Sequence, residues 1–243
     1  MKPFLIIRTG QAPDNIRARH GDFPDWFRLA ARLEPHQVQV IDVAAGEHLP
    51  PPADVAGALI TGSAAMVTER ASWSENTAGW IRNAMDIDLP LIGVCYGHQL
   101  MSHALGGRVD YLPGGREIGT VPIELLPEAA QDSLTGHMQE TTFRAHATHE
   151  QSVLEIPKGA HILARSERDP HHLLRYGRNA VSTQFHPEFN ADIMRAYIRR
   201  KHHDMRREGF DPQHTFRQVA ATPLARRLLK TFSRHHGFSR SAR

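Results

Sequence analysis

The chain's single cysteine, Cys95, stands where a strand could deliver a nucleophile. The apolar run 91–94 predicts a buried strand, and Gly93 and Gly97 flank the cysteine in a Gly-x-Cys-x-Gly pattern that leads into a helical segment. Glycines on both sides permit a sharp turn that side chains would obstruct. A thiol at a helix N-terminus is favoured as thiolate, and the N–H group of Tyr96 would be free to bind an oxyanion. The alternative, a small buried core cysteine, fits a glycine-flanked turn poorly because such a turn packs little.

A cysteine nucleophile needs a base, and the segment 181–189 offers a candidate pair. His186 follows an apolar strand, and Glu188 stands two residues later, beyond a proline that stiffens the bend. A carboxylate acceptor would fix the imidazole tautomer and leave the second ring nitrogen for the thiol. Because the chain has 17 histidines, this spacing alone singles out His186 only weakly.

Taken together, the two segments resemble the class I, triad-type glutamine amidotransferases, most closely the glutaminase domain of GMP synthase and its stand-alone relatives. The likeness rests on residues 93–99 (Gly-x-Cys-x-Gly-x-Gln) and 184–188 (Gln-Phe-His-Pro-Glu), and it extends over about residues 38–190. It implies a flavodoxin-like α/β fold, with an open, mostly parallel sheet flanked by helices and additional antiparallel strands. The implied chemistry requires no cofactor and no metal.

The resemblance also implies roles for the three side chains. Cys95 would attack the side-chain amide of L-glutamine, His186 would act first as base and then as acid toward the departing ammonia, and Glu188 would orient His186. A glutamyl thioester would form, and water would release glutamate.

Further positions carry over from the same family. Gly62, in the turn after the third strand, and Tyr96 would supply the backbone N–H groups of an oxyanion hole. Gln99 would line the substrate pocket, and Thr148 and His149 match the segment whose backbone contacts the α-carboxylate end of the substrate.

Two departures from the GMP synthase pattern leave the substrate open. The turn 61–67 reads Thr-Gly-Ser-Ala-Ala-Met-Val instead of starting with the usual Gly-Gly-Pro, so Ser63 and Met66 reshape the pocket rim. The chain also carries neither a Ser-Gly-Gly-x-Asp-Ser nor a Gly-x-x-x-x-Gly-Lys-Ser/Thr phosphate loop. Ammonia would then pass to a separate ammonia-accepting synthase or to solution. The alternative substrate is a γ-glutamyl peptide or conjugate, cleaved by the same triad.

Hydrophobic patterning must supply the elements that position these residues. Strands and helices alternate up to about residue 105, which favours a parallel sheet covered on both faces, and a run of strands follows. Ser72, with Glu75 three residues later, fits a capping box at the start of a helix. Helices are also expected over 192–207 and 223–234. No linker is evident, so residues 1–243 are expected to form one domain, with a core of about 38–190 and a basic helical extension of about 191–243.

Charge is unevenly distributed along the 243 residues. The formal net charge is +3, yet the segment from Arg195 onward carries +10 and the preceding residues −7. A basic segment of this kind usually forms a helix face exposed to solvent. The second interpretation is a docking surface for an acidic partner. Nucleic-acid binding through this tail, and a non-catalytic binding module on the same fold, are weaker alternatives.

Several classes of protein are excluded or disfavoured by composition. No apolar run approaches the ~20 residues needed to cross a bilayer, and the N-terminal run 4–7 is too short for a signal-peptide core, so a cytoplasmic protein with no membrane contact is expected. One cysteine excludes an internal disulfide framework. The histidine groups around 146–149, 171–172 and 202–203 lack convincing supporting ligands and are expected to be structural. The sequence leaves the oligomeric state open.

Overall fold

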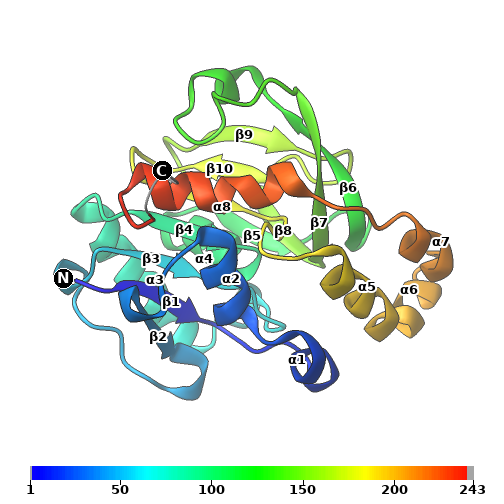
Figure 1. Ribbon diagram of the computed structural model, residues 1–243, viewed down its shortest axis with the longest axis horizontal. Helices are drawn as coiled ribbons and strands as arrows, with labels where there is room; N and C mark the ends of the chain where they lie inside the picture. Colours follow the sequence, from blue (N-terminus) through cyan, green and yellow to red (C-terminus); the bar gives the residue numbers. More distant parts are fainter. Residues whose placement is uncertain (1, 240–243) are drawn as a thin grey trace.

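The protein, as a computed structural model that describes residues 2–239, has an α/β architecture built on one large open sheet (Figure 1). The order of its strands is β2-β1-β3-β4-β11-β10-β9-β6-β7. The first five of these run parallel and the remainder antiparallel. The parallel strands are β2 (Val38–Asp42), β1 (Phe4–Arg8), β3 (Gly57–Ile60), β4 (Leu91–Val94) and β11 (Ala180–Thr183). The antiparallel strands are β10 (Leu173–Arg175), β9 (His161–Arg165), β6 (Glu117–Leu125) and β7 (Thr142–His149). The predicted fold class is confirmed.

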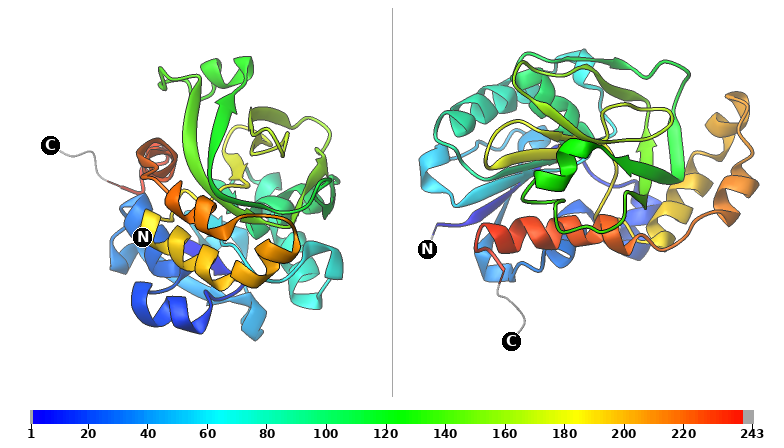
Figure 2. Two further views of the ribbon diagram at one scale, coloured as in Figure 1. Left: turned by 90° about the vertical axis from the view of Figure 1, so that its right-hand side faces the viewer. Right: turned by 90° about the horizontal axis from the view of Figure 1, so that it is seen from above.

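Two helical layers cover the parallel part of the sheet (Figure 2). The alternation within β1 shows how the sequence builds both layers, because successive strand residues point to opposite faces. Phe4 and Ile6 join one buried apolar cluster, and Leu5 and Ile7 join the other. The first cluster includes α2 (Phe23–Ala31), α5 (Ala191–Arg200) and α8 (Pro223–His235), and the second includes α3 (Ser72–Asp86) and α4 (Tyr96–Ala104). Central strands buried on both faces need the continuous apolar runs seen in the sequence.

Several elements differ from the sequence prediction. The predicted 192–207 helix divides into α5 and α6 (His202–Arg207), because at Lys201 the backbone leaves helical geometry (φ −87°, ψ 7°). The predicted capping box is wrong, since Ser72 is already the first helical residue and Ala71 precedes it without a side-chain cap. Four short elements were not predicted: α1 (Asp14–His20), α7 (Pro212–Arg217), and the strands β5 (Arg108–Tyr111) and β8 (Gln151–Glu155), which pair antiparallel in a separate two-stranded sheet.

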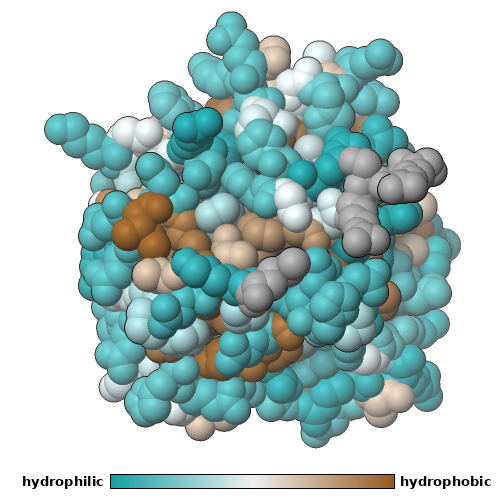
Figure 3. Space-filling view, turned by 60° about the vertical axis from the view of Figure 1, so that its left-hand side comes forward, coloured by the Kyte–Doolittle hydropathy of each residue, from teal (hydrophilic) through white to brown (hydrophobic). Residues whose placement is uncertain are grey.

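The C-terminal helix α8 is firmly part of the fold. It lies along α2 and near β7, and buries Leu228, Leu229 and Phe232 in the same cluster as α2 (Figure 1). Residues 240–243 of the predicted basic extension lie outside the described residues. The surface in Figure 3 is mainly hydrophilic, with apolar side chains in small areas. Within residues 2–239, no helix combines the length and apolar character required to span a membrane.

Candidate active site

Cys95 occupies a sharp turn between β4 and α4, at the C-terminal end of a central parallel strand. Its backbone has φ 53° and ψ −103°, a conformation that residues other than glycine rarely adopt. The two flanking glycines are required by close packing: a Cβ on Gly93 would lie 2.5 Å from the Gly97 carbonyl oxygen, and one on Gly97 would lie 2.3 Å from the Ile60 carbonyl oxygen. The turn therefore holds the thiol at the N-terminus of α4, as the sequence predicted.

His186 comes from the strand next to the one that carries Cys95. β11 pairs in parallel with β4, with Thr183 opposite Val94, so both chains leave the sheet at the same edge. The N–H group of His186 donates to the carbonyl of His146 (2.7 Å), which fixes the backbone beyond β11. Both functional side chains thus emerge together, as parallel strands require.

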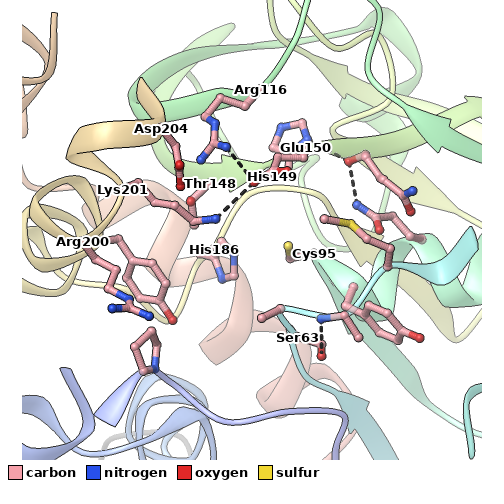
Figure 4. Close-up of a pocket in the computed structure, with 18 of the residues that line it drawn as sticks. Ser63, Cys95, Arg116, Thr148, His149, Glu150, His186, Arg200, Lys201 and Asp204 are labelled. Atoms are coloured by element: carbon pink, nitrogen blue, oxygen red, sulfur yellow. Dashed lines mark hydrogen bonds and ion pairs between the residues drawn. The ribbon is translucent and has the colours of Figure 1, made fainter. Parts of the chain in front are cut away.

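Glu188 lies behind the His186 ring. His186 Nδ1 and Glu188 Oε1 are 2.7 Å apart, and both side chains are buried. The ring stacks on Phe189 at 4.1 Å between centroids. Since a carboxylate accepts, Nδ1 carries the proton. Nε2 makes no hydrogen bond to any described residue, and Cys95 and His186 point toward each other in the pocket (Figure 4).

The charges in this group favour an ion pair. Burial alone would raise the pKa of the Cys95 thiol, but the charge of His186 and, after it, that of His149 lower it below its ordinary value. Burial opposes protonation of His186, yet the charges of Glu188 and Cys95 outweigh it and raise its pKa to about 10. A thiolate beside an imidazolium is the state that a cysteine nucleophile requires.

A pocket of about 440 Å³ opens over these residues (Figure 4). Six of the residues singled out by sequence line it: Cys95, Tyr96, Gln99, Thr148, His149 and His186. Glu188 stands behind His186. Gly62 is set back from the lining, where a Cβ would lie 3.1 Å from His186 Cε1, and the following residue, Ser63, lines the pocket. The amide nitrogen of Gln99 donates to the carbonyl of Gln151 (2.7 Å) and to the side chain of Gln184.

A charged part of the pocket lining was not predicted as part of the site. Glu150 joins Arg116 (2.8 Å) and Lys201 (3.1 Å) in an ion-pair group, and Arg116 also pairs with Glu208 (Figure 4). Arg200, the last residue of α5, also lines the pocket, and it forms no hydrogen bond or ion pair with residues 2–239. The expected solvated helix face is therefore correct for only part of this segment. Helical charge spacing alone carries no signal that one side of it meets a pocket.

A buried group of polar residues extends inward from His149, which lines the pocket. The two imidazoles of His149 and His172 both contact Glu117, and these residues place potential metal ligands within 4.8 Å of one another. The 2.6 Å between His172 Nε2 and Glu117 Oε2 fits a direct charge-assisted hydrogen bond. Two ligands of a tetrahedral zinc ion, each at about 2.0 Å, would stand roughly 3.3 Å apart. We therefore describe the group as a hydrogen-bonded network.

Comparison with known proteins gives a consistent result. Residues 29–204 match the family model described as glutamine amidotransferase class-I. The chain is 30% identical to gamma-glutamyl peptidase 4 of Arabidopsis thaliana, over 78% of this chain and 67% of that protein. It is 35% identical to a glutamine-hydrolyzing GMP synthase of Lactococcus lactis over 44% of this chain, and spans only 20% of that longer protein.

Solved structures agree at the level of the fold. A glutamine amidotransferase from Thermotoga maritima superposes with a TM-score of 0.74 at 19% identity, covering 97% of this chain and 98% of that one. A glutamine amido transferase from Methylobacillus flagellatus gives 0.73 at 21% identity, covering 100% and 97%.

Proposed function

The chain belongs to the class-I glutamine amidotransferase family, and we propose that it hydrolyses the γ-glutamyl amide of L-glutamine with Cys95 as nucleophile. The Cys95 thiolate attacks the amide carbon, and the carbonyl π electrons move onto oxygen. As the C–N bond breaks, the proton on His186 Nε2 passes to the leaving nitrogen, and ammonia departs. Water, deprotonated by His186, then cleaves the glutamyl thioester to give glutamate and the free thiol.

The geometry of the turn suggests where the oxyanion would be stabilised. Tyr96 is the first residue of α4, and the N–H groups of a helix's first turn have no intrahelical acceptor. We place the second donor in the 62–63 turn, with Gly62 as the residue predicted from the family pattern. Gly62 already lies against the His186 ring, which supports a donor at this side of the thiol.

One observation carries this proposal: His186 lines the pocket with Cys95, its Nε2 has no hydrogen-bond partner among residues 2–239, and Glu188 holds the opposite ring nitrogen. The direct test is release of glutamate from L-glutamine by the purified protein and by Cys95→Ala. We expect release by the first and none above background by the second. Equal rates would refute the proposal, provided that both proteins show the same circular dichroism spectrum.

A second candidate activity, cleavage of γ-glutamyl peptides, is favoured by the Arg200 side of the pocket. The cavity extends from the thiol to α5 and α6, beyond the immediate surroundings of Cys95. Arg200 presents a guanidinium that has no partner in the described part of the chain, which suits a carboxylate on the leaving amine. The match to a gamma-glutamyl peptidase over 78% of the chain supports this alternative.

The fate of the nitrogen product depends on which activity holds. If L-glutamine is the substrate, we propose that a separate synthase accepts the ammonia. The name of the similar GMP synthase, described as glutamine-hydrolyzing, pairs glutamine hydrolysis with a synthase in the same way. If γ-glutamyl peptides are the substrate, no such partner is needed. A non-catalytic binding role would be favoured only if neither class of compound reacts and Cys95 resists alkylation.

A further inference from the structure

His149 has acceptor oxygens at both of its ring nitrogens. Nδ1 lies 3.0 Å from the carbonyl oxygen of Gln151, and Nε2 lies 3.1 Å from a carboxylate oxygen of Glu117. A carbonyl oxygen only accepts, so Nδ1 carries a proton. Burial would raise the pKa of Glu117, but hydrogen bonds from His149 and His172 lower it well below its usual value, so Glu117 accepts as well. Both ring nitrogens of His149 must therefore donate, which only the imidazolium form can do.

The neighbouring histidines show that burial alone has the opposite effect. His98 and His146 are also buried, and burial lowers their pKa values to about 3 and about 4. Within the described range, neither has a carboxylate at hydrogen-bond distance: His98 contacts the Ser182 hydroxyl and His146 that of Thr120. The carboxylate of Glu117 is thus the feature that sets His149 apart.

The carboxylate is itself fixed in place. One oxygen of Glu117 accepts from His149 and from His172, and the other accepts from the Ser166 hydroxyl (2.7 Å). Asp169 adds a second negative charge 4.0 Å from His149 Nδ1. Glu117 of β6 and the 166–172 segment therefore act together on one imidazole and favour its charged form.

We propose that His149 is a positioning residue whose imidazolium, held by Glu117, stabilises the thiolate of Cys95 in the pocket that both residues line. This inference rests on the proposed role of Cys95 as nucleophile. It differs from the family-derived expectation, which used only the backbone of residues 148–149. His149 and Cys95 line the same pocket, and the His149 side chain is almost wholly buried, so solvent screens the interaction weakly.

The charges around Cys95 and around His149 favour the thiolate and the imidazolium, respectively. Cys95 faces His186 and His149 as cations and Glu188 as an anion, with burial opposing the thiolate. His149 faces Glu117, Asp169 and the Cys95 thiolate, which together outweigh its burial and raise its pKa above the ordinary value. In its charged form His149 favours the thiolate, as an opposite charge nearby does.

The test uses the fact that Cys95 is the chain's single cysteine, so alkylation reports on one thiol. We would measure the rate of iodoacetamide modification against pH, by intact mass, for the full chain and for His149→Gln. Glutamine keeps an N–H donor but removes the charge. We expect the midpoint of the Cys95 alkylation rate against pH to be about one pH unit higher in His149→Gln. At a pH below both midpoints the variant would then hold about tenfold less thiolate. An unchanged midpoint in a folded variant would overturn the proposal.

Two further variants protect the conclusion against a simple folding defect. Glu117→Gln removes the carboxylate that keeps His149 charged, and we expect the same upward shift although the pocket wall is untouched. His172→Gln is the matched control, because it alters a donor to the same carboxylate at a residue outside the pocket lining. A midpoint in His172→Gln that rises as far as in His149→Gln would indicate general loosening of the network and contradict the proposal. If the midpoint of alkylation is unchanged in His149→Gln while the starting protein releases glutamate in a Cys95-dependent way, this proposal fails and the proposed reaction stands. If the starting protein releases no glutamate, the proposed reaction fails instead.

Discussion

His186 Nδ1 lies 2.7 Å from Glu188 Oε1 at the end of β11, and the opposite ring nitrogen makes no hydrogen bond to residues 2–239. This relation fixes the direction in which the imidazole can act. Because Nδ1 donates to the carboxylate, only Nε2 can exchange a proton with a thiol or a substrate.

Replacing Glu188 should reduce turnover while leaving the fold intact. Glu188→Gln keeps the shape of the side chain but removes the charge that favours the imidazolium of His186. We expect kcat for glutamate release to fall about a hundredfold or more. Steady-state assays at saturating substrate test this, and a rate within about threefold of the starting protein would contradict the orienting role.

Gly93 and Gly97, which flank Cys95, should be needed for stability as well as for activity. A Cβ on Gly97 would stand 2.3 Å from a backbone carbonyl oxygen of β3, which cannot easily move. We expect Gly97→Ala to destabilise the protein by more than about 2 kcal/mol in urea unfolding. Gly79→Ala is the control: it lies within α3, where the nearest atom belongs to the flexible Arg82 side chain at 3.6 Å. That variant should gain roughly 0.5–1 kcal/mol.

Activity should depend on pH through two displaced ionisations. The pKa of Cys95 is lowered by His186 against the effect of burial, so the acidic limb of kcat/KM should be centred below the ordinary thiol value near 8.5. The pKa of His186 is raised to about 10, so the rate should fall again only as pH approaches that value and the imidazolium is lost. A profile of kcat/KM against pH tests both limbs. An acidic limb centred near the ordinary thiol value would contradict the ion pair.

Arg200 should discriminate between leaving groups if the second candidate activity holds. We expect Arg200→Gln to raise KM about threefold for γ-glutamylglycine, which carries a free carboxylate, and to leave KM for γ-glutamylglycinamide unchanged. Arg199→Gln is the matched control, because Arg199 is the preceding residue but packs its guanidinium over Phe216 at 4.8 Å. Equal effects of the two substitutions, or equal effects on the two substrates, would argue against a carboxylate subsite.

The sequence was most informative where local geometry dictates residue type. Gly93, Cys95 and Gly97 predicted a strand–turn–helix junction because only glycines fit the backbone contacts found there. The alternation of strands and helices likewise predicted the parallel half of the sheet, since buried central strands need unbroken apolar runs.

The sequence was least informative where distant segments meet. Glu117 and His149 lie 32 residues apart and come together only through the antiparallel pairing of β6 with β7, where they stand opposite each other. Lys201 similarly contacts Glu150 across 51 residues. Neither relation leaves a spacing pattern in the sequence. The charged groups around His149 and Glu150 therefore form only when the chain folds.

The most direct test of the central claim is to look for the covalent intermediate. The protein would be mixed with L-glutamine or a γ-glutamyl peptide, quenched in acid within milliseconds and analysed by intact and peptide mass spectrometry, with Cys95→Ala alongside. We predict a mass increase of one glutamyl group on the peptide that contains Cys95, sensitive to hydroxylamine as thioesters are, and neither adduct nor turnover in Cys95→Ala. Undiminished glutamate release by Cys95→Ala would contradict the assignment of Cys95 as the nucleophile.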